Sequence, residues 1–75
     1  MSDLDDQLLR AHENQDHDQL VLLYTQAADE SEAQGDVEAA CFYLTHAFVF
    51  ALETGHAQLS KLNERLVAYG REEPL

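Results

Sequence analysis

The sequence predicts an all-α fold of four short antiparallel helices in a single domain spanning residues 1–75. Apolar residues recur three and four positions apart, which is the period of an amphipathic helix. No segment shows the strict alternation of a half-buried strand. Turn-forming residues interrupt the pattern at positions 14–16, 35, 55 and 70, and Pro74 follows the last interruption. Connections this short make successive helices antiparallel neighbours.

The first two helices are expected over residues 3–13 and 18–34. Leu4, Leu8 and Ala11 share one face of the first helix, which stops at residues 14–16. Asp16 or Asp18 is expected to cap the second helix, which stops before Gly35. Its apolar residues are Leu20, Val21, Leu23, Tyr24, Ala27 and Ala28.

The third helix is expected over residues 37–54, between an Asp36 cap and Gly55. Its packing face is predicted to hold Val37, Ala40, Cys41, Leu44, Ala47, Phe48, Ala51 and Leu52. The opposite side is also apolar and carries Phe42, Tyr43, Val49 and Phe50. Because a helix that is apolar nearly all round is a central one, either the other helices surround it or another chain covers part of it.

The fourth helix is expected over residues 57–69, with Leu59, Leu62 and Leu66 on its apolar face. Arg65 lies near its carboxyl end, where positive charge is favourable. Residues 1–3 and 71–75 are expected to fray.

The chain is strongly acidic: it has four Lys and Arg residues and fifteen Asp and Glu residues, which gives a formal net charge of −11. No Lys or Arg occurs in residues 11–60. Nucleic acids and anionic membranes are therefore disfavoured as partners, because both need clustered positive charge. The longest apolar run, residues 39–52, is too short to span a bilayer, and the acidic amino terminus is unlike a signal peptide. With one cysteine and no disulfide, the expected location is the cytoplasm.

Gly35-Asp36, followed by Ala40, Leu44 and Ala47, resembles the turn and second helix of a tetratricopeptide repeat. A weaker copy stands twenty residues earlier: Gln15-Asp16, then Leu20, Tyr24 and Ala27. The resemblance covers about residues 21–53. Ser31 departs from it, since the family has a large aromatic there, and the proline that often follows the second helix is missing. The resemblance implies helical hairpins and protein–protein binding without chemistry.

Three groups of reactive residues have simpler interpretations as structural or surface residues. His12 and His17 are five positions apart, whereas a shared metal on one helix face needs a spacing of four, so they are interpreted as solvated loop residues. Cys41 is interpreted as a buried apolar residue, and His46 as a surface or interface residue without a catalytic partner. We therefore expect no catalytic residue, metal or cofactor. A small metal-dependent enzyme is the least favoured hypothesis.

Two surfaces remain as candidate partner sites. The first is the aromatic side of the 37–54 helix: Phe42, Tyr43, Val49 and Phe50. It is either internal core or the contact surface of a homodimer or another protein partner, and aromatic residues are enriched at the centres of interfaces. The second is an acidic tip, which would hold a basic protein or peptide: Asp29, Glu30, Glu32, Asp36 and Glu38. The leading hypothesis is a non-enzymatic module that self-associates through the aromatic side.

Overall fold

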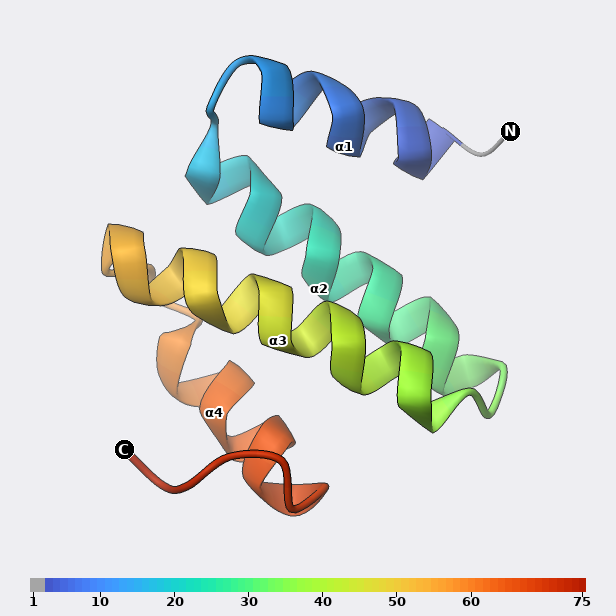
Figure 1. Cartoon of the computed structure of the whole chain (residues 1–75), viewed down its shortest axis with the longest axis vertical. Helices are drawn as coiled ribbons and strands as arrows, with labels where there is room; N and C mark the ends of the chain where they lie inside the picture. The colour runs from blue at the N-terminus through green and yellow to red at the C-terminus, as the bar shows by residue number, and fades with distance from the viewer. Residues whose placement is uncertain (1–2) are drawn as a thin grey trace.

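The computed structural model describes residues 3–75 and confirms the predicted all-α fold. Its helices are α1 (Asp3–Glu13), α2 (His17–Ala33), α3 (Val37–Thr54) and α4 (Leu59–Ala68) (Figure 1). The helix α4 is shorter than predicted, because residues 57 and 58 belong to the turn that precedes it. In that turn, the backbone N–H of Gln58 donates to Nδ1 of His56 at 3.0 Å, a bond outside the helical pattern.

All four helices end in the same turn. A backbone N–H just past each helix donates to the carbonyl five residues before it, the pattern of a Schellman motif. These bonds join Asp16 to Ala11, Asp36 to Ser31, His56 to Ala51, and Arg71 to Leu66. The residue before each donor has a positive φ, and the residues are Gln15, Gly35, Gly55 and Gly70. The twenty-residue echo in the sequence is therefore a repeated turn, in which Gln15 (φ 53°) takes the place of Gly35 (φ 76°).

Aspartates begin both central helices. An Oδ1 atom of Asp16 accepts from the N–H of Gln19 at 3.3 Å, and that of Asp36 accepts from the N–H of Ala39 at 3.1 Å. Each carboxylate satisfies one of the N–H groups that a helix start leaves unpaired. Turn and cap together fix where α2 and α3 start.

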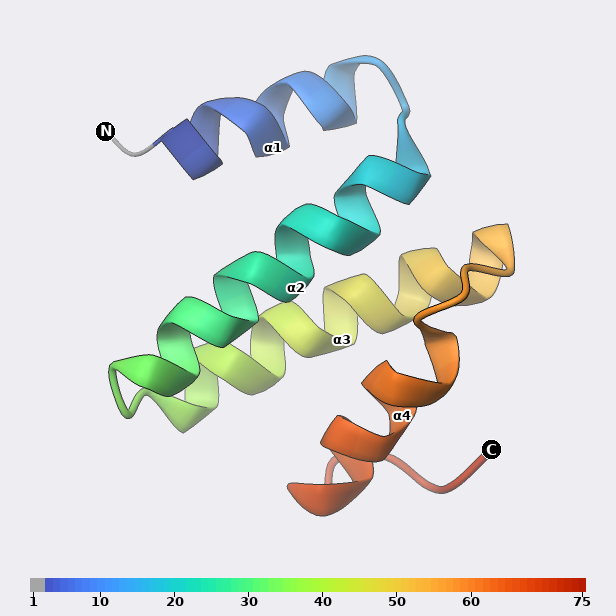
Figure 2. The same cartoon turned by 180° about the vertical axis from the view of Figure 1, so that it is seen from behind.

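Each helix packs against the next one along the chain. Within residues 3–75 the helices whose backbones lie close together are α1 and α2, α2 and α3, and α3 and α4. In Figure 1 the helix α3 lies in front of α2 and α4, and Figure 2 shows the same order from behind. The result is a flat molecule with Cα extents of 31 × 29 × 14 Å. A molecule this thin leaves one side of its central helix uncovered.

The core lies between the central helices. Ala40, Leu44, Ala47 and Ala51 of α3 are fully buried, as their spacing predicts. Small residues at these positions let α2 approach closely, and Leu44 fills the space between them. The core joins α2, α3 and α4 through Val21, Ala28, Leu44, Ala47, Phe48, Ala51, Leu62 and Leu66. A smaller cluster under α1 contains Ala11, Leu20 and Leu23.

The carboxyl-terminal segment is not helical, but Asn63 of α4 holds part of it. The Asn63 amide donates to the carbonyl of Glu73 at 2.9 Å and accepts from the N–H of Leu75 at 3.2 Å. At the other end, Asp3 already belongs to α1. The expected fraying of residues 1 and 2 lies outside the described residues.

Candidate functional site

The aromatic side of α3 divides into an exposed part and a half-buried part. Phe42 is 58% exposed and Val49 is 45% exposed. Tyr43 and Phe50 are half-buried and pack against the core. The two alternatives that the sequence left open, internal core and surface, therefore each hold for half of the predicted set.

A continuous stripe of exposed residues runs along α3. It is formed by Phe42, Thr45, Val49 and Leu52, and we call it the exposed stripe. Their spacings of three and four are those of a coiled-coil seam. Leu52 is 50% exposed and Val37 is 44% exposed, so their prediction as packing residues was wrong. Leu52 lies at the edge of the predicted arc. Val37 lies near its middle, but it is the first residue of α3. The heptad spacing of Phe42, Thr45 and Val49 would have predicted that Leu52 belongs to the exposed stripe.

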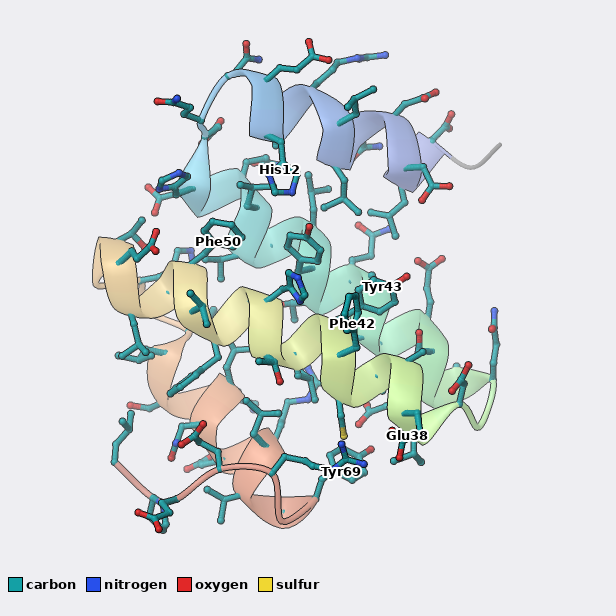
Figure 3. The ribbon with its side chains drawn as sticks, in the orientation of Figure 1. His12, Glu38, Phe42, Tyr43, Phe50 and Tyr69 are labelled. Atoms are coloured by element: carbon teal, nitrogen blue, oxygen red, sulfur yellow. The ribbon has the colours of Figure 1, made fainter. Side chains whose placement is uncertain are left out.

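The half-buried part belongs to a cluster of rings centred on Tyr24 of α2. The Tyr24 ring lies 6.0 Å from that of Phe50, 6.2 Å from that of Tyr43 and 5.0 Å from that of His46, measured between centroids. His12 joins from α1, with its Nε2 2.8 Å from the Tyr24 hydroxyl. Burial, and secondarily Tyr43, raises the pKa of Tyr24. Figure 3 shows His12, Phe50, Tyr43 and Phe42 along the face seen in Figure 1.

His12 and His17 lie in helices, so their placement in a loop was wrong, although His12 is exposed to solvent as predicted. His12 lies in the last turn of α1 and contacts the rings of Tyr24 and Phe50. His17 is the first residue of α2, where its ring lies 5.3 Å from that of Phe50 and its Nδ1 lies 3.7 Å from a Glu53 oxygen. No sequence motif predicts these contacts, because they join residues of three different helices.

His46 and Phe42 form a pair at the centre of the exposed face. His46 Nδ1 lies 2.9 Å from the Phe42 carbonyl, to which the protonated nitrogen donates. The rings of the two residues are 4.5 Å apart. This contact restrains the exposed Phe42 side chain without covering it.

Two hollows flank Phe42 along α3. The more apolar one, of about 220 Å³, is lined by four residues of α3 itself: Thr45, His46, Val49 and Phe50. The other, of about 550 Å³, lies toward the carboxyl-terminal segment and includes Glu38 and Arg71 in its lining. The surface therefore presents a projecting ring beside an apolar recess.

The acidic tip has partners within the chain. An Nη2 atom of Arg65 lies 2.8 Å from both Asp29 and Glu32, and Arg71 lies 2.7 Å from Glu38. The Tyr69 hydroxyl donates to Glu32, and this bond, together with Arg65, holds the pKa of the Glu32 carboxyl below its usual value.

The other two residues of the tip have different roles. Asp36 caps α3. Glu30 is exposed, and no ion pair to it is found in the described part of the chain. Four of the five predicted tip residues thus dock α4, hold the carboxyl-terminal segment or start a helix. These roles do not favour an adaptor for basic partners.

Three further findings concern the cysteine, metal binding and membrane spans. Cys41 is a free, buried thiol, as predicted. Among residues 3–75, no three His, Cys, Asp or Glu side chains converge in a way that would hold a metal ion. None of the helices in the same range combines the length and apolar character needed to cross a bilayer.

Comparisons with protein-family models, curated proteins and solved structures find no match to this chain. Its functional interpretation therefore depends on the site geometry.

Proposed function

We propose that this protein is a non-enzymatic protein-interaction module that self-associates through the exposed stripe of α3. The observation that carries the proposal is the stripe itself, in which Phe42, Val49 and Leu52 are each about half exposed. Exposed apolar residues that occur singly need no explanation, whereas a continuous row marks an interaction surface. The row also has the spacing that two helices use to pack together.

The distribution of charge limits where two copies of this chain can meet. Each copy carries a formal net charge of −11, so two copies repel over most of their surface. Between Glu38 and Glu53, however, α3 carries no Asp, Glu, Lys or Arg. Two copies that meet along this segment bring the fewest like charges together.

The resemblance to a tetratricopeptide hairpin supports the same class of function. The structure is compatible with a helical hairpin repeat, formed by α2, the Gly35-Asp36 turn and α3. Hairpins of this kind bury one face against their neighbours and use another for binding. A short, open array with an uncovered helix fits a binding module.

Sedimentation equilibrium of the wild type and Phe42→Glu tests the proposal. The wild type should dimerise, and Phe42→Glu should weaken the dimer by at least roughly 30-fold, because an interface anchor contributes about 2 kcal/mol or more. The control is Leu22→Glu, which changes an exposed leucine (49%) on α2. Circular dichroism should show that both variants keep their helices.

Salt separates this proposal from binding at the acidic tip. Added salt screens the repulsion between two acidic copies and should strengthen the dimer, whereas it would weaken the binding of a basic partner. A wild type that stays monomeric at high micromolar concentration would refute self-association. So would an equal loss of dimer in Leu22→Glu.

A further inference from the structure

We infer that the second copy docks antiparallel to the first, with Phe42 of each copy inserted between Thr45, His46, Val49 and Phe50 of the other. This inference rests on the proposed self-association and adds its geometry. It makes this face of α3 self-complementary, because each copy supplies one projecting ring and one recess, which extends from the exposed stripe to the half-buried His46 and Phe50.

The size and form of the recess suit an aromatic ring. In helix–helix packing, a side chain of one helix enters a hole formed by four residues of the facing helix. The recess is lined by four residues of α3 alone and measures about 220 Å³. For comparison, a protein cavity of roughly 150 Å³ accommodates benzene. The phenyl ring of Phe42 is 58% exposed and is available to fill it.

The order of ring and recess along α3 requires an antiparallel pair. Phe42 precedes the recess, whose lining begins at Thr45 and ends at Phe50. If two α3 helices run in opposite directions, each Phe42 meets the other's recess at the same time, and a two-fold axis passes beside Thr45. In a parallel pair in register, each Phe42 would meet the other Phe42, and both recesses would stay empty.

The carboxylates at the two ends of the stripe favour the same direction. With the axis beside Thr45, Glu38 faces residue 52 of the second copy and Glu53 faces its residue 37, both of which are apolar. In a parallel pair, Glu38 would face Glu38 and Glu53 would face Glu53. Like charges directly opposite one another destabilise a helix pair.

Disulfide cross-linking between single cysteines tests the direction. Two packed helices have axes about 8–10 Å apart, which leaves facing Cα atoms roughly 4–5 Å apart, close enough for a disulfide. The variants are Thr45→Cys, beside the proposed axis, and Leu52→Cys, seven residues away, both combined with Cys41→Ala to remove the native thiol. In the antiparallel pair the two residues 52 are on the order of 20 Å apart along the helices.

The expected result is a covalent dimer of Thr45→Cys on a non-reducing gel, with Leu52→Cys remaining mostly monomeric. Cross-linking of both variants, or of Leu52→Cys alone, would show a parallel or shifted pair and overturn the inference. Cross-linking of neither, while sedimentation still shows a dimer of the Cys41→Ala parent, would place the dimer contact elsewhere and also overturn it. A wild type without any dimer would instead refute the proposed function.

Discussion

The acidic tip and the exposed stripe of α3 are both conspicuous in the sequence, yet the fold uses them differently. Arg65 lies 33 positions from Glu32 and Arg71 lies 33 positions from Glu38, and both form ion pairs with the tip. No element of residues 3–75 covers Phe42, Val49 and Leu52 in the same way. The carboxylates of the tip thus form ion pairs within the chain, whereas the uncovered apolar side chains of the stripe remain available to a partner. Substitutions in the tip should therefore cost stability, and substitutions in the stripe should cost association.

The largest effect is expected for Arg65→Gln. This change leaves Asp29 and Glu32 without their shared cation, and the Arg65 side chain is only 21% exposed. We expect the free energy of unfolding to fall by roughly 1–2 kcal/mol, measured by urea denaturation. Lys61→Gln is the matched control, because it removes an exposed positive charge from the same helix. If the two variants are equally stable, the ion pairs of the tip do not dock α4.

A smaller, pH-dependent effect is expected for Glu32→Gln. The Tyr69 hydrogen bond and Arg65 lower the pKa of Glu32 from 4.5, so its contribution to stability is complete above that pH and is lost as the pH falls through the folded-state value. The same hydrogen bond raises the pKa of Tyr69 from 10.0, so stability is also lost as the pH rises beyond 10 through the raised value.

The loss of stability in Glu32→Gln should therefore be greatest, about 1 kcal/mol, between these two limits. It should shrink at lower pH, where Glu32 of the wild type is itself neutral. Thermal unfolding of both proteins across this range measures the difference. Glu30→Gln is the control, since it changes an exposed neighbour on the same helix. A pH-independent difference would contradict the role of Glu32.

The smallest effect is expected for Phe42→Ala in dilute protein, where monomers dominate. Phe42 is 58% exposed and contacts the rings of Tyr43 and His46. Its removal should change the free energy of unfolding by no more than about 0.5 kcal/mol, the usual range for surface positions. At high concentration the wild type should gain stability from association and Phe42→Ala should not. A large loss in dilute solution would show that Phe42 belongs to the core.

The parts of this structure that sequence could predict depend on neighbours along the chain. Asp36, Gly55 and the alanines of α3 act through spacings of three to five residues, so the helix limits and the buried face were predictable. Leu52 was misplaced because periodicity does not say how far around a helix its neighbours extend. Phe50 was left open between core and surface, because nothing local shows that His12 and Tyr24 contact it. The ion pairs of Arg65 could not be predicted either, because their partners Asp29 and Glu32 lie on another helix, far away in the sequence.

The open order of the helices has a consequence for how the molecule comes apart. The backbone of α1 lies close to α2 and that of α4 lies close to α3, and side chains add the His12–Phe50 contact and the ion pairs of Arg65 with Asp29 and Glu32. Unfolding of either outer helix breaks these contacts and leaves the pair of α2 and α3 in place. Stability in such an array is approximately a sum over adjacent pairs, so the outer helices can open in sub-global steps while the middle stays folded. Amide hydrogens of α1 should therefore exchange with solvent before those of α2 and α3. The helix that carries the exposed stripe belongs to the slowest-exchanging unit, and a partner bound there would remain bound while either end of the molecule opens.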